Sequence, residues 1–148
     1  MKKSVAIIGG GPSALMLAAE LDEKKFNVII YEKNAALGRK LLVAGAGGFN
    51  LTHSEEITQF IDRYSPSSFF EPLISVYTNN DLRNWLQAIG IRTFAGTSKR
   101  VFPVKGIKPI DVFNAILNVL KKKNVSVKTK CKWEGWANDK IILSDKAI

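Results

Sequence analysis

The feature that most constrains the fold is an apolar segment, Val5 to Ile8, that ends in three glycines and opens onto a helix-forming segment. An uninterrupted apolar run is typical of a strand that is buried on both faces of a parallel sheet. The glycine spacing fits a turn in which the first glycine permits a sharp bend, the second lets backbone approach a pyrophosphate, and a small third residue lets the helix pack closely. The unpaired backbone N–H groups at the start of a helix favour the binding of a phosphate group. The predicted pyrophosphate-binding residues are Gly9, Gly11, Pro12, Ser13 and Ala14.

A second predicted strand, residues 27–33, supports this interpretation of the glycine turn. It follows a short segment with apolar residues at helical spacing, and it ends in an acid. Glu32 lies about 20 residues after the glycines, the distance at which a carboxylate at a strand tip binds the hydroxyls of an adenosine ribose. Glu32 is therefore the predicted ribose ligand, with a solvated strand end as the alternative.

Length and composition indicate one soluble globular domain. The chain has 148 residues, of which 46% are hydrophobic, enough to bury a core. The apolar runs are too short to span a bilayer, and the N-terminus leads directly into a strand rather than a signal peptide. A single cysteine, Cys131, excludes an internal disulfide and suits the cytoplasm, where a packed structural role is expected for it.

A net charge of +9 is typical of some proteins that bind nucleic acid, but the distribution of the lysines argues against nucleic-acid binding here. Residues 121–123 end a predicted helix, where cations complement the helix dipole. Lys128, Lys130 and Lys132 alternate along one face of a predicted strand. Because no recognition motif accompanies them, we expect a solvated basic face, with neither nucleic acid nor a membrane as partner.

A second glycine-rich segment, residues 36–52, follows the second predicted strand in place of a helix. Two adjacent basic residues, Arg39 and Lys40, are followed by a cluster of glycines at positions 45, 47 and 48. This pattern suggests that the backbone of the segment lies closely along a large anionic ligand. The alternative is a loop that merely crosses the sheet.

This segment resembles the signature G-R-K-[LV]-L-x-[ST]-G-x-G-R-C-N-x-[ST] of the HI0933-like or BaiN-like NAD(P)/FAD-dependent oxidoreductases, bacterial flavoproteins of the glutathione-reductase-like, two-dinucleotide-binding group. Residues 38–42 match, and so do Gly45, Gly47, Asn50 and Thr52. The usual arginine-cysteine pair is Gly48-Phe49 here, which removes any chemistry that depends on that cysteine. The family's G-R-V-F-P-V element is matched at residues 100–104, with Lys99 in place of the glycine.

The resemblance implies that the chain holds FAD, whose flavin supplies hydride chemistry, with NAD(P)H as a candidate electron donor. Phe49 would pack where a thiol usually lies. No catalytic acid, base or nucleophile is identified. The residues implied to contact FAD beyond the first turn and Glu32 are Lys33, Arg39 and Lys40 near phosphate and ribose, and Gly47, Gly48, Phe49 and Asn50 near the flavin ring.

The remaining chain predicts a helical insertion at about residues 53–123. Residues 52–55 have capping-box spacing before a helix that stops at Ser65-Pro66, and His53 is expected to be a surface residue. Further helices are predicted over 69–77 and 81–89, with a strand at 91–94. A long helix should begin at Pro109. Its buried face is predicted to be Ile110, Phe113, Leu117 and Leu120, and Asn124 should end it.

The predicted fold class is α/β: a Rossmann-like FAD-binding domain with a parallel sheet, the helical insertion between its second and third strands, and a small C-terminal β-hairpin. Residues 125–133 are the predicted third strand, and Asn138-Asp139 is the predicted hairpin turn. The match corresponds to the N-terminal third of a typical family member, so we expect a partial domain that is inactive alone and self-associates through an open sheet edge. The alternative is a nucleotide-binding or interaction module that does not retain flavin.

Overall fold

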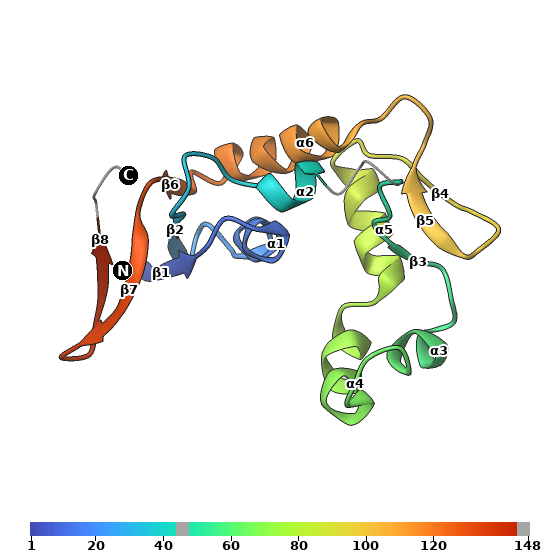
Figure 1. Cartoon of the computed structure of the whole chain (residues 1–148), viewed down its shortest axis with the longest axis horizontal. Helices are drawn as coiled ribbons and strands as arrows, with labels where there is room; N and C mark the ends of the chain where they lie inside the picture. The colour runs from blue at the N-terminus through green and yellow to red at the C-terminus, as the bar shows by residue number, and fades with distance from the viewer. Residues whose placement is uncertain (44–47, 145–148) are drawn as a thin grey trace. The chain divides into compact units, whose positions relative to one another are not determined.

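The computed structural model describes residues 1–43 and 48–144 and divides into two compact units (Figure 1). The first unit consists of Met1–Val43 and Phe113–Ile148, and the second of Ala44–Val112. The helix α6 (Pro109–Lys122) crosses this boundary in the sequence.

The first unit contains a three-stranded parallel sheet in the order β1-β2-β6. Its strands are β1 (Lys3–Ile8), β2 (Phe26–Tyr31) and β6 (Ser126–Lys128). The helix α1 (Pro12–Glu20) connects β1 to β2, and α6 leads into β6. This arrangement confirms the predicted α/β class with a parallel sheet. A short helix, α2 (Arg39–Val43), stands in the glycine-rich segment where no helix was predicted.

The prediction that the first strand is buried on both faces was wrong. Ile7 is buried, whereas its neighbour Ile8 is 43% exposed and Ala6 is exposed too. Successive strand residues point to opposite faces, so one face of β1 is covered and the other is open. On the covered side, α1 packs on β1 and β2 and buries Leu15, Ala18 and Ala19.

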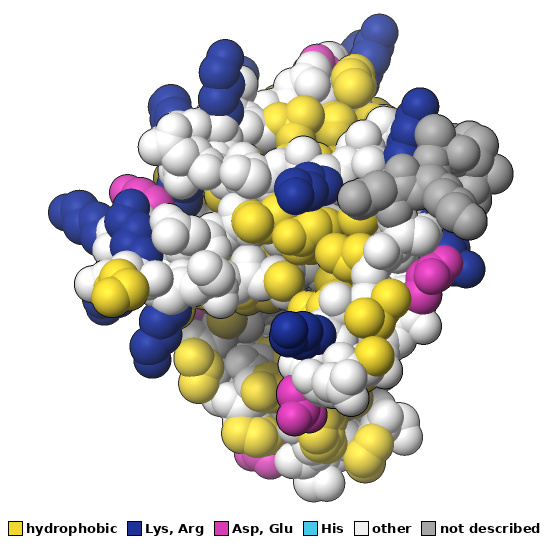
Figure 2. All heavy atoms as spheres, turned by 90° about the vertical axis from the view of Figure 1, so that its left-hand side faces the viewer, with side chains coloured by type: hydrophobic (Ala, Val, Ile, Leu, Met, Phe, Trp, Pro, Cys, Tyr) yellow, Lys and Arg dark blue, Asp and Glu magenta, His cyan; other side chains and the backbone are white. Residues whose placement is uncertain are grey.

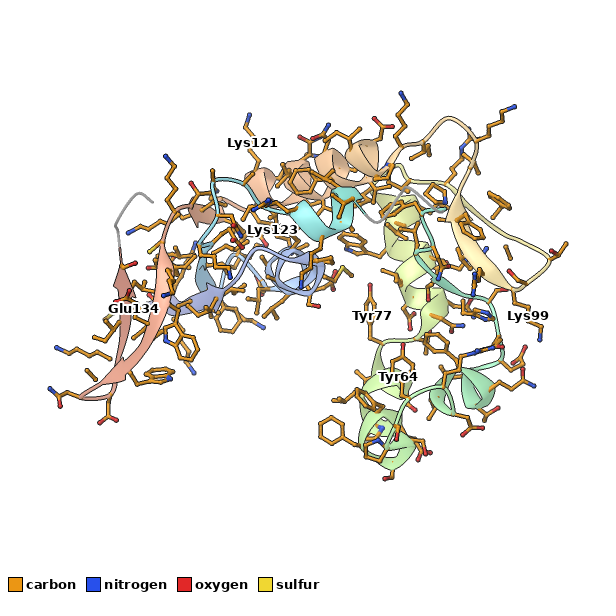
Figure 3. All side chains as sticks on the ribbon, viewed as in Figure 1. Tyr64, Tyr77, Lys99, Lys121, Lys123 and Glu134 are labelled. Atoms are coloured by element: carbon orange, nitrogen blue, oxygen red, sulfur yellow. The ribbon has the colours of Figure 1, made fainter. Side chains whose placement is uncertain are left out.

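The helix α6 begins at Pro109 as predicted, but its buried residues differ from the expected set. Ile110 is exposed, and the buried side chains are Val112, Phe113, Ile116 and Leu120. Asn124 has φ of 55°, which confirms its predicted left-handed conformation. Lys123, labelled in Figure 3, donates to the backbone carbonyls of Ala19 and Leu21 at the end of α1, so the two helices end side by side.

The predicted strand at 125–133 is broken after Lys128. Lys130 has φ of 56°, and its N–H donates to the carbonyl of Asn34 at 3.0 Å, while Cys131 donates to the carbonyl of Glu32 at 2.9 Å. Because of these two hydrogen bonds, the chain after Lys128 crosses the end of β2 instead of continuing as a strand beside it. The expected row of lysines on one strand face is therefore absent, whereas the packed role of Cys131 agrees with its burial.

The C-terminal hairpin is confirmed. The strands β7 (Lys132–Ala137) and β8 (Lys140–Ser144) pair antiparallel. Both turn residues, Asn138 and Asp139, have positive φ, as a two-residue hairpin turn requires. Figure 2 shows apolar side chains exposed among lysine and arginine side chains on one face of the molecule; the exposed apolar residues of the first unit include Ile8, Val127, Trp133, Trp136 and Ile142.

The second unit combines helices with a small antiparallel sheet in the order β3-β5-β4. Its elements are β3 (Thr52–His53), α3 (Ile57–Ile61), α4 (Ser67–Val76), α5 (Asn79–Ala88), β4 (Thr93–Ala95) and β5 (Arg100–Pro103). The capping box predicted at Thr52 was wrong, because Thr52 pairs with Val101 in the sheet. The capping box that exists joins Thr78 and Asp81 at the start of α5.

The open side of β1 predicts self-association. β1 pairs with β2 on one side, and no described residue pairs with the other. Unpaired N–H and C=O groups at a sheet edge favour pairing with another chain. We expect multi-angle light scattering at micromolar concentration to find oligomers, and Ala6→Lys to reduce them, since a charge on an edge strand disfavours pairing. Ala88→Lys, in the second unit, is the control. A monomer with tightly bound flavin would contradict the prediction.

Candidate functional site

The carboxyl ends of β1 and β2 lie side by side and bring the two predicted contact points together. Ile8 pairs with Tyr31, so Gly9 and Glu32 are the residues that directly follow the paired ends. The Gly9 N–H donates to the Tyr31 carbonyl at 2.8 Å, and Gly9 turns the chain with φ of 97°, a conformation that glycine adopts without steric cost. Ligands of open α/β sheets bind at this end of the strands.

The Glu32 carboxylate is buried, with the residue 8% exposed, and is held by three hydrogen bonds. Its Oε2 accepts from the Gly10 N–H at 2.7 Å, and its Oε1 accepts from the Asn34 N–H at 2.7 Å and from the Asn34 side-chain amide at 2.5 Å. A carboxylate has about four acceptor positions. One position, on Oε2, therefore remains for a further donor.

These contacts determine the ionisation of Glu32. Burial raises the pKa of its carboxyl, but the hydrogen bonds from Asn34 and Gly10, together with the charge of Lys33, outweigh burial and hold the pKa below its ordinary value. Glu32 is thus an anion that accepts hydrogen bonds at neutral pH.

The glycines that follow Gly9 have opposite surroundings. A Cβ on Gly10 would lie 2.3 Å from the Leu37 side chain and 3.1 Å from Glu32 Oε2, and the Gly10 carbonyl accepts from the Gly38 N–H at 2.8 Å. A Cβ on Gly11 would meet nothing within 4 Å. Gly10 is therefore required by the protein's own packing, whereas Gly11 borders open space.

A hollow of about 480 Å³ lies beside this turn. It contains six of the predicted site residues, and the predicted Pro12, Ser13 and Ala14 form the first turn of α1 next to Gly11. The lining residues are Ile8, Gly9, Gly10, Gly11, Glu32, Lys33, Asn34, Ala36, Gly38, Arg39, Lys40, Lys132 and Trp133.

Positive charge dominates the lining of this hollow. Among the described residues, the cations Lys33, Arg39, Lys40 and Lys132 face one carboxylate, Glu32. Arg39 Nη1 donates to Asn34 Oδ1 at 2.9 Å, which links a cation to the same network that holds Glu32. The hollow is therefore suited to an anionic ligand that also carries hydroxyl donors.

Seven lining residues were not among the predicted site residues: Ile8, Gly10, Asn34, Ala36, Gly38, Lys132 and Trp133. Asn34 could have been suspected, because asparagine just after a strand often hydrogen-bonds locally. Lys132 and Trp133 carry no local signal, since they reach the hollow only through the folding of the chain after β6. Trp133 is 44% exposed, and its Nε1 donates to the Gly135 carbonyl at 2.8 Å.

The part of the second glycine-rich segment that the resemblance places near the flavin, residues 47–50, belongs to the second unit. Gly47 lies outside the described residues, and Gly48, Phe49 and Asn50 precede β3. Phe49 is buried. The Leu51 N–H donates to the Val101 carbonyl at 2.8 Å. The Asn50 amide, oriented to donate, lies 2.8 Å from the Thr52 carbonyl and 3.2 Å from that of Val101, so this segment is tied to β5.

His53 is not the surface residue that was expected. Its side chain is 13% exposed, and Nδ1 lies 3.2 Å from Glu55 Oε2, although the ring nitrogen is not aligned for a hydrogen bond. Glu55 also binds Arg63 through both carboxylate oxygens. The paired carboxylate was missed because His53 lies on a strand rather than in a helix cap.

Two classes of site are not found in the part of the chain that the structure describes. No group of three or more His, Cys, Asp or Glu side chains there could hold a metal ion. No helix there is both long and apolar enough to cross a membrane.

The lowered pKa of Glu32 predicts a pH-dependent stability. A carboxyl whose pKa is lower in the folded state contributes stability above its ordinary pKa, 4.5, and this contribution is lost as the pH falls through the folded pKa. We expect Glu32→Gln to lower the free energy of unfolding by about 1–3 kcal/mol at pH 7 and by less at pH 3, in urea titrations. Glu71→Gln, at an exposed position of α4, is the control and should leave the stability nearly unchanged at both pH values. An equal loss at both pH values would contradict the prediction.

Two solved structures show the same fold. The THI4 protein of Thermovibrio ammonificans aligns with a TM-score of 0.57 at 16% identity, over 96% of this chain and 45% of that one. Glycine oxidase from Bacillus cereus aligns with a TM-score of 0.51 at 17% identity, over 98% of this chain and 52% of that one. The chain thus spans about half the length of these two proteins.

A protein-family comparison identifies the chain more closely. The model of the HI0933-like protein Rossmann domain matches residues 3–146. This match agrees with the parallel sheet, the glycine turn and the acid that follows β2, and it confirms the resemblance seen in the sequence. The chain therefore belongs to the HI0933-like family and carries its Rossmann domain.

Proposed function

We propose that this chain is the FAD-binding segment of a cytoplasmic flavoprotein oxidoreductase. The observation that carries the proposal is the Glu32 carboxylate, which accepts a hydrogen bond from Gly10 of the glycine turn and lines the same hollow as four cations. A dinucleotide offers the matching groups: a pyrophosphate anion and a ribose with two hydroxyls. Membership of a Rossmann family supports the same ligand class.

The pyrophosphate would lie over the glycine turn. Gly9 makes the bend, and the open space at Gly11 admits a phosphate against the backbone. The first turn of α1, formed by Pro12, Ser13 and Ala14, offers N–H groups of residues 13 and 14 that have no intrahelical partner. The helix dipole adds to the attraction. The Lys33, Arg39 and Lys40 side chains would contact phosphate and ribose.

The ribose would bind to Glu32. The carboxylate has one free acceptor position in this structure, so it would accept one ribose hydroxyl directly, rather than both as the sequence suggested. Because its other positions are occupied by backbone and amide donors, the carboxylate is held in place before the ligand arrives. Trp133, on the same hollow, offers an aromatic face on which the adenine can stack.

The flavin end would involve the second motif, Gly47, Gly48, Phe49 and Asn50. When bound, FAD supplies the hydride chemistry, and NAD(P)H is the electron donor that the family resemblance implies. The chain contributes binding and orientation. We assign no side chain of this chain to acid, base or nucleophilic catalysis.

A second candidate function is a nucleotide-binding module that does not retain flavin. It is favoured by the hollow at the glycine turn, whose lining residues all belong to the first unit. ADP contains the groups that the first unit would hold, whereas FAD also needs a flavin pocket. Tight binding of ADP with equal or weaker binding of FAD would favour this second candidate.

Gly11→Val provides the direct test of the phosphate position. The variant should fold, because φ of Gly11 is −81° and its Cβ would meet open space. The branched side chain would occupy the place of the pyrophosphate, so we expect the affinity for FAD and ADP to fall by about 100-fold or more, equivalent to about 2.7 kcal/mol. Isothermal titration calorimetry measures both affinities.

Ala88→Val is the matched control for this variant, since it adds an apolar side chain at an exposed position of α5. It should leave both affinities unchanged. Unchanged affinity of the Gly11→Val protein would show that the turn is not the phosphate site. Failure of the unmodified chain to bind either ligand would contradict the proposed function itself.

Trp133→Leu tests the position of the adenine. Loss of one base-stacking ring should weaken ADP binding by about tenfold, since such stacking contributes about 1–3 kcal/mol. Tryptophan fluorescence should fall when ADP binds the unmodified chain, and this change should disappear in the variant. Trp136→Leu, on the same strand but outside the hollow, should retain both signals. Identical behaviour of the two variants would contradict the stacking role.

A further inference from the structure

The second unit contains a hollow whose lining is basic and polar, separate from the glycine turn. Its volume is about 610 Å³. It lies between α5 and the segment that begins β4, and its polar lining residues are Asn80, Arg83, Asn84, Gln87, Arg92 and Thr93. We propose that this hollow binds the phosphate group of a small molecule.

The helix α5 presents a continuous polar face to the hollow. Residues 80, 83, 84 and 87 have the spacing that places side chains on one face of a helix, and they are three amides and one guanidinium. The buried residues of this helix, Asn79 and Leu86, are not in the lining. All the α5 side chains that line the hollow can therefore donate hydrogen bonds.

The two arginines of the hollow have no carboxylate partner among the described residues that line it. No Asp or Glu appears among the lining residues, and the ion pairs of the described residues include neither Arg83 nor Arg92. Arg83 Nε instead reaches Thr93 Oγ1 at 3.5 Å, the residue next to Arg92. Like charges held in one hollow repel each other, and an anion between them would remove this repulsion.

The donor set indicates phosphate as the anion. Each guanidinium presents a planar fork that matches two phosphate oxygens, and charge-assisted bonds of this kind are stronger than neutral ones. Two guanidinium groups balance the double charge of a phosphate monoester, and the amides of Asn80, Asn84 and Gln87 can bind its remaining oxygens. The hollow lies in the size range of small-molecule sites and exceeds what a lone phosphate fills, so the ligand has a further organic part.

The test titrates the full chain with inorganic phosphate while NMR follows the arginine Nε–H signals. The titration uses constant ionic strength, with chloride as the reference anion. It is carried out in the Gly11→Val background, which removes the glycine turn as a competing phosphate site. We expect saturable shifts of the Arg83 and Arg92 signals, and a weakening of about tenfold in Arg83→Gln and in Arg92→Gln. Arg83→Lys should also weaken binding, because it keeps the charge and loses the fork.

Arg100→Gln, on β5 and outside the hollow, is the matched control and should bind phosphate normally. Equal shifts with chloride, or full binding by both glutamine variants, would overturn the proposal. Binding of a single-stranded oligonucleotide through Arg83 and Arg92 without binding of inorganic phosphate would also overturn it. If Arg83→Gln does not fold, phosphate binding by Arg92→Gln, which changes an exposed residue, decides the test alone.

Discussion

The site depends on one carboxylate at the end of the second strand. The side chain of Glu32 accepts from Gly10, which follows β1, and from Asn34, which follows β2. Its backbone donates to Lys128 of β6 and accepts from Cys131. A single residue thus joins the chain segments that leave all three strands of the parallel sheet. The shape of the glycine turn follows from this network, because Gly10 is fixed by a hydrogen bond on one side and by the Leu37 side chain on the other.

Within this short turn, one glycine is required for folding and the next is available for ligand binding. Gly10 has no room for a side chain because the protein fills it, whereas Gly11 has room that the protein leaves open. A loop that is already held by buried hydrogen bonds loses little conformational freedom when a ligand binds, which favours affinity. The same bonds keep Glu32 ionised, so the acceptor that a ribose would need is ready at neutral pH.

Local sequence signals predicted the parts of the structure that local physics decides. Glycine spacing, the start of α6 at Pro109 and the Asn138-Asp139 turn each depend on residues close in sequence. Predictions failed where a distant partner decided the outcome. Thr52 looked like a helix cap, but it pairs with Val101, and Trp133 reaches the hollow only because the chain turns after β6.

The most direct measurement of the central claim is the response of backbone amide NMR signals to ADP. If the glycine turn holds the pyrophosphate, the N–H signals of Gly10, Gly11, Ser13 and Ala14 should shift together and saturate with one affinity. The signals of α4, in the other unit and outside both hollows, should stay in place. The absence of a saturable shift at the turn would contradict the account.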